Sequence, residues 1–308
     1  MRASSIKSWG LAIALVVISV ALALAKPNFL TIPNLLNVMR QISINGILAV
    51  GVTYVLLTGG VDLSLGSLVA VSGVVAATLA HPNQHALVVP VLLGVLTGTA
   101  CGAVNGLVVT RGQVAPFIAT LGMMTVARGL ALVVSCGRPV SNLSGAFTRL
   151  GGDVAGVPIP VIVLALIALL SHVFLKNLRL GRYIYAVGGN ETAARASGIN
   201  VAAVKLFTYA ACGAMAGVAG VVLAARITTG QPNAGVGYEL DAIAAVVIGG
   251  TSLSGGVGGI GGTLLGVLLI GVINNGLDLL NVTSYYQAIV KGIIIVGAVW
   301  LDRQQQKS

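Results

Sequence analysis

The chain has 308 residues, of which 56% are hydrophobic and 8% are charged, and its formal net charge is +10. Soluble domains carry roughly 25% charged residues, so this composition excludes an ordinary soluble domain. Apolar runs recur along the whole chain, and several reach the roughly 17–25 residues that a helix needs to cross a bilayer. We therefore predict an all-α polytopic membrane protein in which residues 1–308 form one transmembrane domain.

The 42 glycines, the basic charge and the cysteines fit this class. Small residues let membrane helices approach closely, which predicts a tightly packed bundle. A nucleic-acid partner is disfavoured because no basic run occurs outside residues 176–205, and Lys and Arg collect in cytoplasmic loops. Cys101, Cys136 and Cys212 show no CxxC or Cys/His spacing, so no metal site is expected.

The N-terminal segment has two interpretations. Arg2 and Lys7 precede the apolar run Leu11–Ala25, which resembles a cleavable signal peptide. An uncleaved first span is favoured because nine further apolar segments follow. After it, residues 29–40 (FLTIPNLLNVMR) are short, amphipathic and interrupted by proline, which predicts a helix lying in the membrane interface.

Ten spans are predicted, with discontinuous helices among them. Three longer polar segments separate them, at residues 135–157, 176–205 and 226–238. The expected spans are 9–25, 44–58, 64–80, 86–109, 114–134, 158–175, 206–225, 240–250, 261–277 and 285–301.

The distribution of basic residues gives the orientation. With the N-terminus inside, ten Lys and Arg residues fall on the inner side and five on the outer side. Cytoplasmic segments carry this excess, so both termini and residues 176–205 are expected in the cytoplasm. The ten inner residues are Arg2, Lys7, Arg111, Lys176, Arg179, Arg182, Arg195, Lys205, Arg303 and Lys307.

An internal duplication is suggested by two similar segments. Residues 59–66 read GGVDLSLG and residues 249–256 read GGTSLSGG, at an offset of 249 − 59 = 190. Each follows a predicted span that is short for a crossing. Paired short, glycine-interrupted segments point to discontinuous helices around a transport site. The sequence leaves open whether the copies are parallel or inverted, and chance similarity is the alternative.

Polar side chains in these copies and in the adjoining spans are the candidates for a path taken by a polar, uncharged solute. Charges within spans are costly and normally face the bundle interior or water. For Asp62, a functional role in a solute path or an internal ion pair and a structural role in packing are equally favoured, whereas Arg128 and Lys291 favour a structural role. Glu239, Asp241 and Asp278 lie at span ends and are expected to be solvated. The candidate path residues are Asn45, Asp62, Ser64, Ser252, Ser254, Asn274 and Asn275.

Motifs for enzymatic chemistry are missing from the sequence. Residues 256–261 match GxGxxG, but a dinucleotide site requires a strand and a βαβ unit around it. GxxxxGK[ST], HExxH and GxSxG do not occur. We therefore expect no enzymatic activity, no cofactor and no nucleotide site of its own, so a transport process would take its energy from another protein.

Four segments carry a family resemblance. LTGGVDLSLGS (57–67), APFIATLGMMTVARG (115–129), GRYIYAVGGNETAARASGI (181–199) and AVVIGGTSLSGGVGGIGGT (245–263) occur in this order. Together they resemble the permease subunits of ribose-type monosaccharide ABC importers, over nearly the whole chain. The resemblance implies a homodimeric inner-membrane permease that moves a neutral monosaccharide inward by alternating access. Its implied partners are a cytoplasmic ATPase subunit, which binds ATP and Mg, and a periplasmic solute-binding protein.

Within residues 176–205, the resemblance implies a coupling element that contacts the ATPase. Glu191 stands for the acidic position of that element and Gly198 for its glycine, while Thr192 departs from the expected alanine. Small side chains would let a short helix enter a groove, Glu191 and Arg195 are spaced i and i+4 for polar contacts, and Gly198 can end the helix. The candidate coupling residues are Gly189, Asn190, Glu191, Ala193, Ala194, Arg195 and Gly198.

Several alternatives remain open at this level. Ribose is the favoured solute, and another pentose or hexose or a branched-chain amino acid is the alternative, since related permeases share the fold. A stand-alone secondary transporter is disfavoured because the chain has only seven acidic residues. A membrane-embedded enzyme is disfavoured because no catalytic constellation occurs.

Overall fold

A computed structural model describes residues 2–307, with side chains described for residues 10–283, 285–294, 296 and 297. Within this range the chain is helical almost throughout. The side chains of Arg2, Lys7, Arg303 and Lys307, which entered the orientation argument, lie outside the described residues.

Each of the ten predicted spans contains a helix. Six of these helices (α2, α4, α5, α7, α10 and α12) are long and apolar enough to cross a membrane, and Gly10–Ala25 and α3 are shorter apolar helices. The structure thus confirms a polytopic helical protein, while the number of crossings stays a prediction. The ten helices are α1 (Arg2–Ala25), α2 (Ile32–Leu57), α3 (Leu65–Leu79), α4 (Val88–Thr110), α5 (Pro116–Val134), α7 (Ile159–Asn177), α10 (Val201–Arg226), α11 (Tyr238–Ile248), α12 (Ile260–Leu279) and α13 (Ser284–Lys307).

The separate interfacial helix at residues 29–40 is wrong. A single 3₁₀ turn, η1 (Pro27–Leu30), is followed by the continuous 26-residue helix α2. Pro33 lies in the first turn of α2, where a missing N–H costs nothing. The proline therefore marks the start of a long helix, and the span before the first GGxxLSxG segment is not short.

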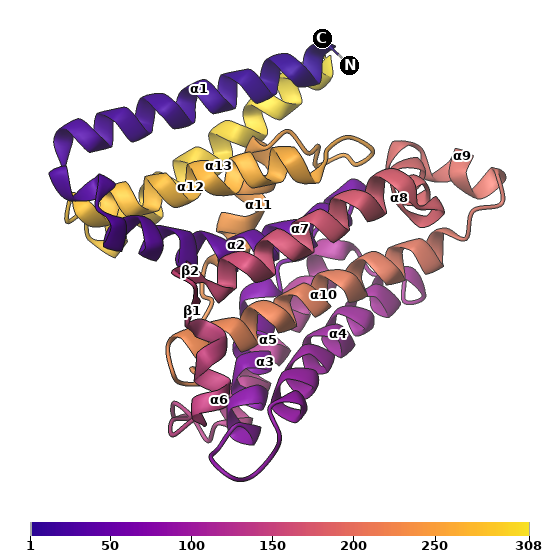
Figure 1. Ribbon diagram of the computed structural model, residues 1–308. Coiled ribbons are helices and arrows are strands. Elements are labelled where there is room, and N and C mark those ends of the chain that lie inside the picture. The colour runs from indigo at the N-terminus through magenta and orange to yellow at the C-terminus, as the bar shows by residue number, and fades with distance from the viewer. Residues whose placement is uncertain (1, 308) are drawn as a thin grey trace.

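The central packing is between α10 and the helices α2, α3 and α4 (Figure 1). Glycines let α4 and α10 touch backbone to backbone: a Cβ added at Gly98 would lie 2.8 Å from Gly217 Cα, and one at Gly213 would lie 2.8 Å from Gly102 Cα. This is the close approach expected of small residues between membrane helices.

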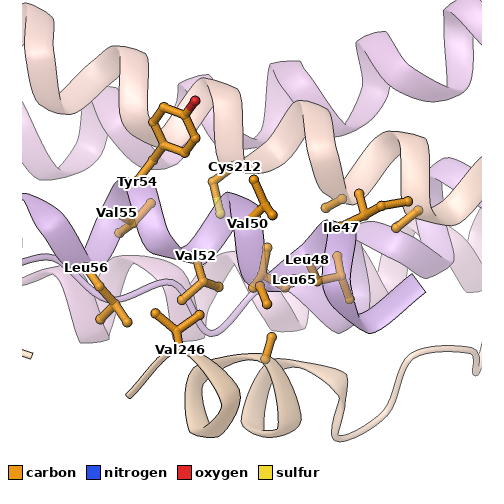
Figure 2. Packing of buried hydrophobic residues seen from close by; sticks show 14 of the residues in the cluster. Ile47, Leu48, Val50, Val52, Tyr54, Val55, Leu56, Leu65, Cys212 and Val246 are labelled. Carbon is orange, nitrogen blue, oxygen red and sulfur yellow. The ribbon is translucent and has the colours of Figure 1, made fainter. Parts of the chain in front are cut away.

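The other face of α2 contacts α11 and α12, and α12 also packs on α1. Val246 of α11 lies beside Val52 and Leu56 of α2 in the apolar core (Figure 2). Helix α12 is antiparallel to α2, since Thr263 meets Thr53 and Asn275 meets Asn34, and antiparallel to α11, since Gly262 meets Gly249 and Gly266 meets Ala245. Helices α2 and α11 therefore run in the same direction. The hydroxyls of Thr53 and Thr263 lie 2.8 Å apart and join α2 to α12.

The polar segments form the two ends of the bundle. Residues 145–158 contain α6 (Gly145–Thr148), η2 (Arg149–Gly151) and a hairpin of β1 (Asp153–Val154) with β2 (Val157–Pro158). At the opposite end, α8 (Arg179–Gly189) and α9 (Glu191–Ala196) follow α7, and α1 begins and α13 ends toward that same end (Figure 1).

Candidate functional site

Residues 176–205 form an ordered unit rather than the polar loop expected from composition. Helix α8 buries Gly181, Ile184 and Val187 against the bundle and exposes its basic residues. The physical reason is the amphipathic spacing of its apolar residues, three apart, which lets a charge-rich segment pack along one face.

Helix α9 is a six-residue helix defined at both ends. The Asn190 side chain caps its start, with Oδ1 accepting the Ala193 N–H at 2.9 Å. Gly198 follows its end with φ +81°, a left-handed conformation that favours glycine. Ala194 is buried, whereas Ala193 and Arg195 are exposed. The helix therefore shows small and charged side chains outward.

An ion-pair network ties α9 to α10. Glu191 Oε2 lies 2.7 Å from Lys205 Nζ, and Glu191 Oε1 lies 3.1 Å from Arg195 Nη2. The hydrogen bond from Lys205 is the main reason that the pKa of Glu191 is lowered from its ordinary value, and Arg195 adds to it. The Glu191–Lys205 pair thus links α9 to α10, in addition to the packing of buried Ala194 and the direct connection to α8 through Asn190.

A groove of about 270 Å³ runs beside α9. Its walls come from the C-terminal end of α4, from α9 and from the first turn of α10. Together with the exposed residues of α9 it offers a polar surface at one end of the bundle. The lining residues are Val109, Thr110, Gln113, Glu191, Arg195, Val201, Ala202 and Lys205.

The first glycine loop (residues 59–66) is buried and hydrogen-bonded. Asp62 is fully buried, and its Oδ1 accepts the Ser64 N–H at 2.9 Å and the Ser64 hydroxyl at 2.6 Å. Asn105 of α4 donates to Ser64 Oγ at 3.0 Å, and the Tyr209 hydroxyl of α10 donates to the Val61 carbonyl at 3.3 Å. Two helices thus fix this loop.

The second glycine loop (residues 249–256) repeats the turn with a different side chain. Ser252 Oγ accepts the Ser254 N–H at 3.1 Å, at the positions equivalent to Asp62 and Ser64. The loop and the residues after it contain four left-handed glycines, namely Gly250, Gly255, Gly256 and Gly258. A cavity of about 610 Å³ opens beside it, lined also by Lys176, Arg182 and Tyr185.

The two glycine loops touch each other. A Cβ added at Gly59 would lie 3.5 Å from the Ser254 carbonyl oxygen, and the Gly256 N–H donates to the Leu57 carbonyl at 3.0 Å. Since α2 and α11 run in the same direction, the two copies lie side by side at the ends of parallel helices.

The remaining candidate path residues lie elsewhere. Asn275 exchanges hydrogen bonds with Asn34 at 3.1 and 2.9 Å, joining α12 to α2. Asn274 donates to Asp241 Oδ2 at 3.3 Å, and Asn45 lies mid-way along α2. The seven predicted residues therefore do not converge on one cavity within this chain, and their role in transport stays a prediction.

The solvated position expected for Asp241 is wrong. Asp241 is buried, and its Oδ2 lies 2.8 Å from Lys291 Nζ of α13. Glu239 is half-buried and accepts the Gly237 N–H at 3.2 Å, while Asp278 is exposed as expected. Arg128 donates to the carbonyl oxygens of Pro232 and Ala234 at 2.7 and 2.8 Å, which agrees with a structural role.

Several residues of these sites were missed by sequence reasoning. Asn105 and Tyr209 fix the first glycine loop, and Lys205 pairs with Glu191, yet each lies on a different helix from its partner. Lys205 alone carried a signal, as the last charge of the 176–205 segment. Among the residues described, no group of three or more His, Cys, Asp or Glu side chains could hold a metal ion.

Comparison with known proteins identifies relatives across the chain. The family model "Branched-chain amino acid transport system / permease component" matches residues 34–299. The ribose import permease of Escherichia coli (strain K12) is 50% identical over 96% of this chain and 93% of its own length, and that of Bacillus subtilis (strain 168) is 47% identical over 94% and 91%. The D-allose transport system permease of Escherichia coli (strain K12) is 40% identical over 94% and 89%. No solved structure matches.

Proposed function

The chain belongs to the family of branched-chain amino acid transport system permease components, close to the ribose import permeases, and from this we propose that it is the permease subunit of an ATP-binding cassette importer for ribose. The similarity to ribose permeases from distant bacteria, over more than nine-tenths of the chain, carries the proposal. The fold alone does not name a solute.

The energy enters through α9 in this proposal. A short exposed helix with small side chains, held to α10 by the Glu191–Lys205 pair, suits insertion into a groove on a cytoplasmic ATPase that binds ATP and Mg. The permease itself catalyses no reaction and needs no cofactor. The orientation with both termini and α9 in the cytoplasm is supported by the excess of basic residues at that side.

The solute crosses between two copies of the chain by alternating access. The scattered positions of the candidate path residues support this arrangement, since they do not meet within one copy. A periplasmic binding protein delivers ribose to the outer face, and the protein resides in the bacterial inner membrane. Neutral hydroxyl groups of a sugar match the amide and hydroxyl side chains predicted along the path.

Reconstitution tests the proposal. The purified chain is reconstituted in proteoliposomes with its ATPase and binding protein. Labelled ribose is expected to accumulate only when ATP is present on the side of the membrane where the ATPase is bound. Excess unlabelled D-allose serves as the competitor that distinguishes a ribose carrier from a broader hexose carrier. Uptake that an ion gradient drives without the ATPase contradicts the proposal. If the mass of the purified transporter in detergent corresponds to one permease copy, the proposed dimer is wrong.

A further inference from the structure

Gly188, in the last turn of α8, lies where three segments of backbone meet. A Cβ added there would collide with the Leu57 carbonyl oxygen and lie 2.5 Å from the Gly256 nitrogen. Leu57 ends α2 just before the first glycine loop, and Gly256 ends the second glycine loop. Only a residue without a side chain fits between them.

The contact is mutual. A Cβ at Gly255 would lie 2.9 Å from Gly188 Cα and 2.9 Å from the Gly59 nitrogen, and a Cβ at Gly256 would lie 2.8 Å from Gly189 Cα. The end of α8 is therefore in backbone contact with the second glycine loop, which in turn touches Gly59 of the first, so movement of α8 must displace the second glycine loop. Close-packed interiors transmit strain in this way because no gap absorbs it.

A second attachment lies one turn earlier on α8. The Tyr185 hydroxyl donates to the Gly258 carbonyl oxygen at 3.0 Å, just beyond the second glycine loop. This bond and the glycine contact fix α8 at two points on the same segment. Helix α9 follows after a single residue, Asn190.

We propose that Gly188 and Tyr185 are positioning residues that transmit movement of α9 to the second glycine loop, so that engagement of the ATPase shifts this loop against the first glycine loop at the sugar path. The inference rests on the proposed function, because it takes α9 as the surface that the ATPase moves. Neither residue contacts the ATPase or the sugar in this scheme. The contact of Gly188 with the backbone of Leu57 and Gly256 is steric, and α8 transmits the movement as a short rigid helix.

Gly188→Ala tests the glycine contact in the reconstituted transporter. The added Cβ forces α8 away from Leu57 and Gly256, so the sugar molecules moved per ATP hydrolysed are expected to fall about tenfold, within the range usual for coupling between sites. Gly261→Ala is the matched control, since this glycine is also helical, lies near the same loop and has no atom within 4 Å of an added Cβ. The control is expected to keep the wild-type ratio.

Tyr185→Phe tests the second attachment without adding volume. It removes only the hydroxyl, so the protein is expected to fold and to keep its basal ATP hydrolysis. The number of sugar molecules transported per ATP hydrolysed is expected to fall about two- to fivefold. If both Gly188→Ala and Tyr185→Phe keep the wild-type ratio of sugar transported to ATP hydrolysed, the proposal is overturned. A merely structural role lowers the melting temperature and leaves the ratio unchanged, which also overturns it.

Failure of the proposed function gives a different result. In that case the wild-type protein itself shows no ATP-dependent uptake. If wild-type uptake needs ATP but the two variants stay coupled, the function holds and the positioning role of Gly188 and Tyr185 is wrong.

Discussion

The two glycine loops make the same turn in different surroundings. In both, a side chain at the fourth position accepts the N–H of the residue two further on, Asp62 for Ser64 and Ser252 for Ser254. The first glycine loop is then fixed by Asn105 of α4 and Tyr209 of α10. The second is followed by a cavity and rich in left-handed glycines.

The difference indicates that the two glycine loops differ in how easily they rearrange. In the first glycine loop Asp62 accepts two hydrogen bonds from Ser64, and Asn105 of α4 donates in turn to Ser64, so a shift of the loop against α4 leaves buried polar groups unpaired in an apolar interior. A serine hydroxyl is a weaker acceptor and lets its loop rearrange at lower cost. We infer that the first glycine loop is the fixed side of the pair and the second the moving side, with α8 in contact with the second.

Removal of the two turn acceptors has the largest expected effect and tests this difference directly. Asp62→Ala leaves the N–H and hydroxyl of Ser64 buried without their acceptor, which should lower the free energy of unfolding by about 3 kcal/mol. Ser252→Ala removes one acceptor in a less enclosed loop and should cost about 1 kcal/mol. Melting temperatures of the purified variants in detergent measure both.

Asp62→Asn is the control for this pair. It keeps an oxygen at the position of Oδ1 and so is expected to lie closer to the wild type than Asp62→Ala. Equal destabilisation by Asp62→Ala and Ser252→Ala would show that the two loops are held alike and would break the comparison.

Sequence reasoning located the helices and the two loops but not their partners. Apolar runs set the helix positions because crossing a bilayer demands length and apolar composition, and ten helices fall where spans were predicted. It misplaced the start of α2 because Pro33 reads equally as a break or as a first-turn residue. It expected Asp241 in solvent because Lys291 lies 50 residues away in the chain.

In the coupling segment too, the sequence predicted local features but not contacts with distant residues. The caps Asn190 and Gly198 were readable as local signals, since each acts on backbone within a few residues. The close backbone contacts of Gly188 were not, because one glycine among 42 gives no sign of what a Cβ would meet. Local rules predict turns and caps, whereas contacts between distant segments need the fold.

A smaller effect is expected from strain in the second glycine loop. Gly256 has φ +72°, and Gly256→Ala should cost about 1–2 kcal/mol for the left-handed conformation, besides pressing on Gly189. If this loop moves during transport, initial uptake rates of labelled ribose should fall further than the melting temperature suggests.

The control for that change is Gly259→Ala, three residues later. Its backbone is extended and an added Cβ would meet only the Tyr185 hydroxyl at 3.9 Å, so wild-type stability and uptake are expected. Parallel losses of stability and uptake in Gly256→Ala would mean that the second glycine loop is as static as the first.

The smallest expected effect concerns Glu191 of α9, the helix that α8 connects to the second glycine loop. Its pKa is lowered by Lys205, so the ion pair contributes fully above the ordinary glutamate value near 4.3 and is lost as the pH falls through the lower pKa of the folded protein. Because Glu191 is partly exposed, the pair is worth less than about 1 kcal/mol and weakens in high salt. At pH 7, Glu191→Gln should therefore speed amide exchange in residues 190–200 up to about fivefold.

Exchange in the two glycine loops distinguishes what this pair controls. If α8 links α9 to the second glycine loop, Glu191→Gln should also raise exchange in residues 249–256 while leaving residues 59–66 protected, since Asp62 and its partners hold the first loop independently. Arg195→Gln, which removes the more exposed partner, should change exchange less than Glu191→Gln. Equal changes in both glycine loops would mean that they move as one body, and the asymmetry drawn from Asp62 and Ser252 would then concern stability alone.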